Sequence, residues 1–412
     1  MIKRPLSFDR FFRYEHEVRP FSWQFESDRL FVNIEEKTVL PYGKGRSYGD
    51  SCLNDGGILF DVGYLNKVIA FDKQAGLITC EAGFTIGQML ELVSPYGWFV
   101  PVSPGTKHVT IGGAVANDIH GKNHHVRGSF GNNIASIKLL RSDGSVNTYS
   151  EADEMFEATV GGLGLTGVIL EVTVRLIKAG SWFETENIKF NTLDDFFKIS
   201  DESERDWEYT VAWIDSTATG ERLGRGVFMR GNHATDLSLP LKVPKPLAGV
   251  PVNFPNFCLN KHSVTAFNWL YFNKQFADKQ NRIVHYETYL YPLDALEGWN
   301  KIYGSRGFHQ YQFVIPEAEK GALKDLFKII ANSGQASFLT VLKKFGDVEP
   351  VGRLSFPSPG YMLALDFADY GDETDRLFAR LDQIVVAVGG RLYPAKDSKM
   401  SGEDFKKFYP RL

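Results

Sequence analysis

The sequence has 412 residues, of which 43% are hydrophobic and 23% charged. These are ordinary values for a globular protein, and they exclude a disordered, collagen-like or coiled-coil chain. At about 150 residues per domain, the length predicts two to three domains. The chain carries 46 basic and 50 acidic residues, and it has no basic tract, so a nucleic-acid partner is not expected. Glycines are frequent (39) and aromatics make up 14%, which indicates tight turns and flat surfaces for packing or binding.

The three cysteines, Cys52, Cys80 and Cys258, are too few and too scattered for a disulfide framework or a zinc knuckle. They fit a reducing compartment. The first residues lack the apolar core of a signal peptide, and no run of 18 apolar residues follows. We therefore expect a cytoplasmic protein without a transmembrane helix, for which peripheral membrane contact stays open.

The first 180 residues alternate short strands and turns with a few helices. The strand-like segments are bounded by Gly, Pro and Asp, and the pair Asp143-Gly144 marks a hairpin turn. Strands are expected at 37–43, 56–62, 75–83 and 167–179, a hairpin at 133–150, and helices at 85–97 and 153–162.

After residue 181, Phe and Trp become denser and glycine thins out. Strands are expected at 204–216, 225–231, 285–296, 308–316, 335–346 and 360–368, and helices at 316–334 and 372–390. This pattern predicts an α+β domain with helices over an antiparallel sheet. Five prolines between residues 237 and 257 argue against regular structure there. That stretch fits either a lid that meets a lipid or membrane surface, or a loop packed on the domain.

Three glycine clusters lie at 42–50, 104–125 and 161–167. The third contains G-x-G-x-x-G, but a helix is expected before it and a strand after it, the reverse of a Rossmann motif. In the first cluster, backbone N–H groups can form an anion-binding nest, and no Gly-Lys-Ser/Thr ending of a P-loop is present. In the second, Gly112-Gly113 is typical of a helix start that touches a phosphate or a flat ring. Together the clusters predict a large, flat, phosphate-bearing ligand.

Three histidines of the second cluster, His120, His124 and His125, raise the question of a metal site. Gly121 and Asn123 interrupt them, and no His-x-x-x-His spacing on a clear helix is present, so no metal is expected. His120 fits better as a hydrogen-bonding group for a cofactor or substrate. The alternative is a buried histidine that serves only the fold.

Six motifs together resemble one enzyme family, in order and over essentially the whole chain. They are GKGRSYGD (43–50), PGTKHVTIGGAVANDIHGKNHH (104–125), GSFGN (128–132), ATVGGLGLTG (158–167), FHQYQFVIP (308–316) and GGRLYPAKDS (389–398). The chain resembles the decaprenylphosphoryl-β-D-ribose 2-oxidase family, FAD-dependent oxidases of the vanillyl-alcohol oxidase superfamily. The resemblance implies an α+β, two-domain flavoprotein with a PCMH-type FAD-binding fold. Its FAD domain would comprise residues 1–181 with 391–412 returning to it, and an antiparallel-sheet substrate domain would comprise 182–390.

The resemblance implies where FAD would bind. Tyr48 stands in the loop region where many relatives have a histidine bonded to the flavin, so it implies non-covalent FAD. The cofactor-binding positions implied are Gly43, Lys44, Gly45, Arg46, Ser47, Tyr48, Gly49, Asp50, Gly105, Thr110, Gly112, Gly113, Asn117, His120, Ile169 and Tyr393.

The family reaction oxidises the 2-hydroxyl of a ribose joined through phosphate to a polyprenol, and the cofactor carries the hydride transfer. The resemblance implies five catalytic residues: Lys396, Gln312, Lys343, Tyr48 and His120. Of these, Lys396 would contact the reacting hydroxyl or the flavin, Gln312 would face the substrate, and Lys343 would meet its phosphate or sugar. Mycobacterial members carry a cysteine on the active-site strand, where this chain has Ala364.

The implied partners are a polyprenyl-phosphate sugar and a short-chain NAD(P)H reductase that would complete an epimerisation. Peripheral membrane contact would run through residues 237–257. Two alternatives stay open. One is an FAD-dependent oxidase of a soluble sugar, alditol or aldonolactone, and the other is a flavin-binding subunit without activity.

Overall fold

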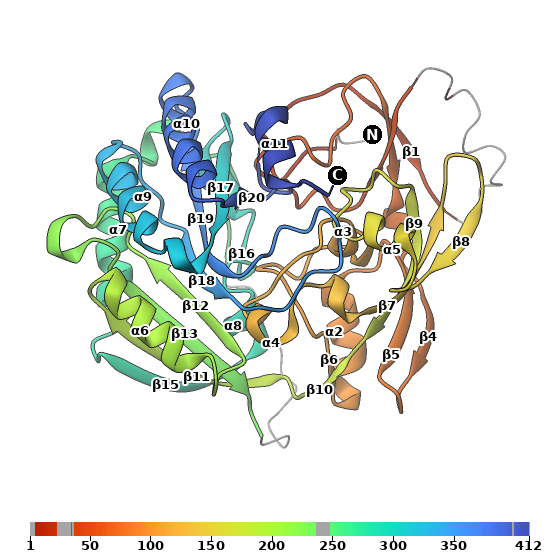
Figure 1. Cartoon of the computed structure of the whole chain (residues 1–412), viewed down its shortest axis with the longest axis horizontal. Coiled ribbons are helices and arrows are strands. Elements are labelled where there is room, and N and C mark those ends of the chain that lie inside the picture. Colours follow the sequence, from red (N-terminus) through yellow and green to blue (C-terminus); the bar gives the residue numbers. More distant parts are fainter. Residues whose placement is uncertain (1–4, 23–33, 35–36, 236–247, 398, 412) are drawn as a thin grey trace.

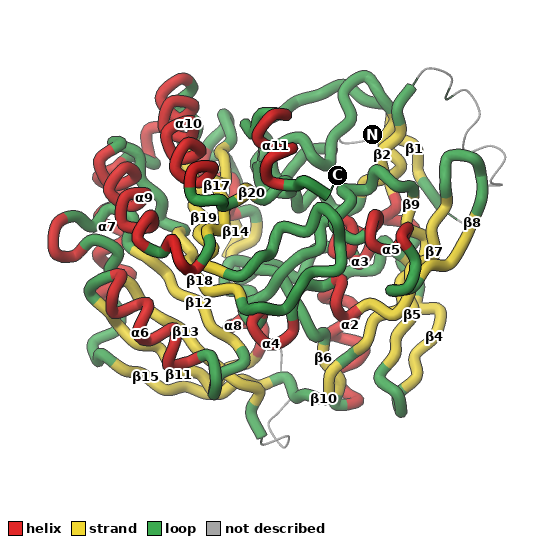
Figure 2. Tube along the Cα trace, viewed as in Figure 1, coloured by secondary structure: helices red, strands yellow, loops and turns green. Residues whose placement is uncertain are grey.

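The computed structural model describes residues 5–22, 34, 37–235, 248–397 and 399–411. Helices and antiparallel sheets are both abundant, which confirms the expected α+β class. Figure 1 shows a five-stranded sheet on one side of the molecule and an eight-stranded sheet with helices on the other. Long loops cross between the two sheets, as the tube in Figure 2 makes clear. In the described part of the chain, no helix is long and apolar enough to span a bilayer.

The side that contains the N-terminus is built on two small sheets. The five-stranded sheet has the order β4 (Val68–Asp72), β5 (Leu77–Glu81), β9 (Val168–Arg175), β7 (Ile134–Leu140) and β8 (Val146–Tyr149). A parallel sheet places β3 (Ile58–Asp61) between β1 (Glu17–Pro20) and β2 (Val39–Tyr42). The helices of this side are α2 (Ile86–Val93), α3 (Ile111–Ala116), α4 (His124–Arg127) and α5 (Glu154–Thr159).

The eight-stranded sheet is antiparallel throughout. Its order is β15 (Lys279–His285), β11 (Trp182–Phe190), β13 (Gly226–His233), β12 (Tyr209–Ile214), β18 (Thr340–Phe345), β19 (Gly360–Ala368), β17 (Phe308–Ile315) and β20 (Arg391–Leu392). One face is covered by α6 (Leu193–Ser203), α9 (Gly321–Asn332) and α10 (Asp372–Ala387). Apolar side chains from this face and the three helices form one buried core, as expected for helices packed on a sheet.

The opposite face of this sheet carries a row of residues fixed by the strand register. Partners across successive strands are Val227, Trp213, Val341, Ala364 and Gln312. Because directly opposed residues point to the same side of a sheet, all five face away from α9 and α10. The helix α7 (Lys261–Asn273) packs at one end of this face, where its Phe272 contacts Trp213 and Val227.

Most expected elements are present, with shorter boundaries, but the strand expected over 285–296 was wrong. The edge strand β15 ends at His285, and the short helix α8 (Tyr286–Leu290) follows it. The side chain of His285 accepts a hydrogen bond from the backbone N–H of Glu287 and so caps the new helix. Its residues Tyr286, Tyr289 and Leu290 are buried in the hydrophobic core that includes the five-stranded sheet, rather than by strand pairing.

Two further expectations are only partly covered. Of the proline-rich stretch 237–257, residues 237–247 lie outside the described residues. In the remainder, β14 (Ala248–Gly249) pairs in parallel with β16 (Leu296–Glu297). The C-terminal segment touches both sides of the molecule: β20 pairs with β17, whereas the N–H of Tyr48 donates to the carbonyl of Ala395. The division at residues 181 and 391 stays a prediction.

Candidate active site

Three of the five expected catalytic residues meet at His120. Its Nε2 lies 2.9 Å from the side-chain amide of Gln312 on β17, and its Nδ1 lies 2.8 Å from Nζ of Lys343 on β18. Lys343 also donates to the carbonyl of Gly121 at 2.5 Å. The cluster therefore joins the glycine-rich segment 104–125 to the uncovered face of the eight-stranded sheet.

Both ring nitrogens of His120 therefore have a nitrogen-bearing partner. The amide nitrogen of Gln312 faces Nε2, and the amine of Lys343 faces Nδ1. A neutral imidazole has one donor and one acceptor nitrogen, so one of these two contacts is donated by the ring and the other is accepted by it.

Burial controls the charge of this cluster. The pKa of His120 is held well below its usual range by burial and then by the neighbouring Lys343. Burial also lowers the pKa of Lys343 well below that of a free lysine, with Lys122 adding repulsion. A positive charge is thus costly on either partner, and His120 is neutral at pH 7.

The other two expected catalytic residues form a second contact beside the first. Nζ of Lys396 lies 4.0 Å from the centre of the Tyr48 ring, within the range of a cation–π contact. The backbone N–H of Lys396 donates to the carbonyl of Tyr393, whose own N–H donates to the carbonyl of Gln312. This short ladder ties Lys396 to the His120 cluster. Burial lowers the pKa of Lys396 to about 8, although Asp366 and Asp9 oppose that shift.

Asp366 is a site residue that the sequence interpretation missed. It lies on β19 two residues after Ala364, so its side chain faces the same side of the sheet. One carboxylate oxygen accepts from Nε2 of Gln310 at 2.6 Å, and the other has no hydrogen-bond partner among the described residues. Burial raises the pKa of Asp366 to about 7, while Gln310 and Lys396 act against this. In the sequence LALDF, side chains alternate between the two sides of the strand, which places Asp366 on the same side as Ala364. This alternation was the signal that could have identified Asp366 as a site residue.

The loop at residues 43–50 packs closely on its neighbours because it carries glycines. A Cβ at Gly43 would lie 2.5 Å from Oγ1 of Thr110, and a Cβ at Gly45 would collide with the Tyr42 hydroxyl. Gly45 and Gly49 also have positive φ angles of 56° and 60°, a conformation that glycine adopts at little cost. Two successive N–H groups of the loop are already paired, that of Tyr48 with the carbonyl of Ala395 and that of Gly49 with the carboxylate of Asp9.

The second loop meets the first at Thr110. Its hydroxyl accepts from the N–H of Gly113 and caps α3, and a Cβ at Gly112 would lie 2.8 Å from that of Ala82. At the other end of α3, the carbonyl of Asn117 accepts from the Tyr393 hydroxyl at 2.7 Å. The two glycine loops and the C-terminal motif thus converge. The residues present fit FAD.

Three of the expected cofactor positions are less engaged. Asp50 is exposed and accepts a hydrogen bond from Tyr14 at 3.2 Å, and a Cβ at Gly105 would meet open space. Ile169 is buried within β9, against which α3 packs. The third glycine cluster follows α5 and precedes β9, in the order expected of a turn. The N–H of Gly161 in this cluster donates to the carbonyl of Val115 on α3.

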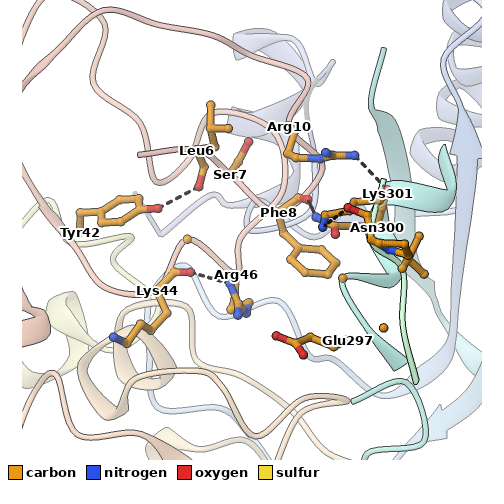
Figure 3. Close-up of a pocket in the computed structure, with 15 residues that line it drawn as sticks. Leu6, Ser7, Phe8, Arg10, Tyr42, Lys44, Arg46, Glu297, Asn300 and Lys301 are labelled. Carbon is orange, nitrogen blue, oxygen red and sulfur yellow. Dashed lines mark hydrogen bonds between the residues drawn. The ribbon is translucent and has the colours of Figure 1, made fainter. Parts of the chain in front are cut away.

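A pocket of about 620 Å³ opens next to the first loop. Figure 3 shows Arg10, Lys44, Arg46 and Lys301 around it, with Glu297 as the carboxylate of its wall. The excess of cations suits an anionic ligand. Its wall includes Phe8, whose ring centre lies 5.4 Å from that of Tyr48, so the pocket is one aromatic layer away from Lys396. The positions expected for FAD and for catalysis therefore adjoin.

Comparison with known proteins agrees with this geometry. Residues 31–150 match the family model of an FAD binding domain. The chain is 38% identical over 387 residues to decaprenylphosphoryl-beta-D-ribose oxidase of Mycolicibacterium smegmatis, covering 91% of this chain and 84% of the relative. It is 24% identical over 395 residues to L-gulonolactone oxidase of Bos taurus, again covering 91% and 84%. FAD is the cofactor, bound by a PCMH-type domain, and the chemistry is oxidation of a CH–OH group. The chain belongs to the decaprenylphosphoryl-β-D-ribose oxidase family of FAD-dependent oxidoreductases.

Proposed function

We propose that this protein oxidises the 2-hydroxyl of a pentose linked through phosphate to a polyprenol, giving the 2-keto sugar. The observation that carries the proposal is the contact of Lys396 with the buried Tyr48 beside the His120 cluster, at positions that match the family motifs. The named substrate of the mycobacterial relative supports the choice of sugar.

Bound FAD would accept the hydride from the carbinol carbon. The protein must then orient the sugar and handle the hydroxyl proton. With a pKa of about 8, Lys396 can take or hold that proton near neutral pH. Gln312 and His120 present hydrogen-bonding groups on the same side of the sheet, and Tyr48 borders the reacting end. Lys343 acts through His120 as a positioning residue, because its amine is already hydrogen-bonded to Nδ1 of His120 and donates to the carbonyl of Gly121.

We further propose that FAD is held without a covalent bond, because Tyr48 occupies the loop position of the linking histidine. The keto product is reactive, so a second enzyme that reduces it from the opposite face would complete an epimerisation. A short-chain NAD(P)H reductase is the proposed partner. A polyprenyl substrate also implies work at a membrane surface, for which residues 237–257 are the segment indicated by sequence.

A second candidate is oxidation of a soluble sugar or aldonolactone. The likeness to L-gulonolactone oxidase over nearly the whole chain is the observation in its favour. Covalent flavin attachment would strengthen this candidate. Acid precipitation distinguishes covalent from non-covalent flavin, because yellow colour released into solution supports the non-covalent assignment.

The decisive test is anaerobic bleaching of the flavin by a panel of substrates. Polyprenyl-phosphate ribose should bleach the wild-type enzyme, whereas free ribose, alditols and gulonolactone should not. Lys396→Ala should keep the yellow colour and lose the bleaching. Bleaching by a free sugar alone would transfer the assignment to the second candidate, and full bleaching of Lys396→Ala would remove the role given to Lys396.

A further inference from the structure

The helix α7 presents large apolar side chains to the outside. Exposed fractions are 56% for Trp269, 61% for Leu270 and 98% for Phe276 just after the helix. Nearly half of the exposed large hydrophobic side chains in the described chain fall between residues 252 and 283. Single exposed apolar residues are ordinary, but such a concentration marks an interaction surface.

The orientation of α7 is fixed by the side of the helix that packs against the sheet. Val264, Asn268 and Phe272, four residues apart, are buried against the sheet. The amide of Asn268 donates to Oδ1 of Asp215 at 3.0 Å. The helix therefore cannot roll to hide Trp269 and Leu270. We call the surface of Trp269, Leu270 and Phe276 the α7 face.

Charge distinguishes the kind of partner that this face fits. Among the described residues from 248 to 285, four are Lys or Arg and one, Asp278, is acidic, although the whole chain has a net charge of −4. Lys279 pairs with Glu186, but Arg282 has no carboxylate within ion-pair distance in the described chain. Arg282 opposes Thr185 on β11, and that register row continues to Gly231 and Tyr209.

Residues of one register row point to the same side of the sheet, so Arg282 shares the side of Tyr209. Tyr209 lies four residues before Trp213 on β12 and therefore points to the same side as Trp213. Arg282 thus points to the side of the sheet on which α7 packs. Arg282 also lies close enough to Lys274 to lower the pKa of that amine, although burial is the larger cause. Aromatic and aliphatic side chains next to cations are the combination that binds the interface of an anionic bilayer.

The α7 face is connected to the candidate active site by packed rings. Phe267 on α7 contacts Phe338, which packs on Tyr303, which stacks on Phe308, which meets Tyr48. Each ring centre lies between 4.1 and 5.5 Å from the next. Tyr48 in turn contacts Lys396. α7 also lies on the same side of the eight-stranded sheet as Gln312, at the end of the molecule away from the five-stranded sheet in Figure 1.

We propose that the α7 face docks this enzyme on the surface of a membrane that contains anionic lipids. The proposal rests on the proposed function, because a polyprenyl-phosphate substrate resides in such a membrane. It adds α7 to the segment 237–257 indicated by sequence, whose exposed Val252, Phe254 and Phe257 precede the helix. Trp269, Leu270 and Phe276 enter the interface, and Arg282 meets the lipid phosphates.

The test uses the FAD-loaded enzyme and flotation with phosphatidylcholine vesicles, with or without phosphatidylglycerol. The wild type should float with the phosphatidylglycerol vesicles. The double variant Trp269→Ser/Leu270→Ser should bind at least about tenfold more weakly, because the apolar area is lost. Arg282→Gln should weaken binding about fivefold, and only when phosphatidylglycerol is present. The matched control is Ile69→Ser, at a residue 52% exposed on β4, which should bind as the wild type does.

The flavin spectrum shows that each variant is folded. The proposal fails if the wild type does not bind these vesicles, or if the double variant binds as well as Ile69→Ser. It also fails if gel filtration shows a dimer that the double variant breaks, since α7 would then face a second copy. Vesicle binding requires no turnover. If the wild type binds the vesicles as expected but polyprenyl-phosphate ribose leaves the flavin unbleached, the docking proposal stands and only the proposed substrate is wrong.

Discussion

Replacing Lys343 by methionine tests the arrangement at the centre of the candidate site. The substitution keeps the length of the side chain and removes its N–H donors. His120 then loses the partner of Nδ1, and the carbonyl of Gly121 loses its donor. Gly121 is buried and His120 is partly buried, so water does not fully replace these contacts.

The size of the effect follows from those two contacts. A buried polar group left without its partner costs about 1–3 kcal/mol. Relief of the burial penalty on the amine offsets part of this, since burial already lowers the pKa of Lys343 strongly. We expect a net loss of about 1–2 kcal/mol in the free energy of unfolding. Activity should suffer more: a misplaced group costs about 100-fold in the rate of flavin reduction.

Lys344 is the matched control, because it lies on the same strand and points to the opposite side. Its amine pairs with Asp201, Glu204 and Glu317 at 2.8–3.1 Å, far from His120. Lys344→Met should lose about 1 kcal/mol of stability, the value of partly exposed ion pairs, and keep its rate of flavin reduction. Stopped-flow flavin reduction and denaturant unfolding measure both quantities. A Lys343→Met enzyme that reduces flavin within threefold of the wild type, roughly 0.7 kcal/mol, would refute the role of Lys343.

Two further predictions concern pH. The ring nitrogens of His124 have no hydrogen-bond partner among the described residues, and burial lowers its pKa to about 3. As pH falls from about 6.5 toward 3, the unfolded chain gains a proton that the folded protein excludes, so stability falls by about 2 kcal/mol at pH 5 relative to pH 7. His124→Phe should remove that loss in denaturant unfolding, and an unchanged pH dependence would contradict it. Asp366→Asn removes a charge that raises the pKa of Lys396. The Lys396 limb of the pH–rate profile should therefore move to lower pH, and a limb that stays in place or moves upward would show that the two groups are not coupled.

Local patterns predicted much of the fold, because most elements carry their own signals. The helix α2 begins at Thr85 with a capping box that Gln88 completes, and α10 follows the apolar period of its sequence. The alternation of FHQYQF places Gln310 and Gln312 on one face of β17, as the structure shows. The strand expected over 285–296 failed because the cap at His285 redirects the chain into α8, a local contact that alternation does not reveal.

The site was predicted less completely, for a physical reason. The motifs indicated His120, Gln312, Lys343 and Lys396, each in its own segment. The distance between Gln312 and Lys343 depends on the register across three strands, β17, β19 and β18, which no single segment encodes. Asp366 has a raised pKa because folding buries it, although its neighbours Gln310 and Lys396 act against that shift. Burial of that kind is a property of the assembled sheet.

The two faces of the eight-stranded sheet explain why chemistry and exposed apolar surface occur together. One face is closed by α9 and α10, so any group that must reach a ligand has to point to the other. That other face carries Gln312 and Lys343, and α7 covers it only at one end. Because Asn268 and Phe272 hold α7 in place, docking on a lipid surface needs no rearrangement of the helix. The fixed packing from Phe267 to Tyr48 then connects the docked helix directly to the contact of Tyr48 with Lys396.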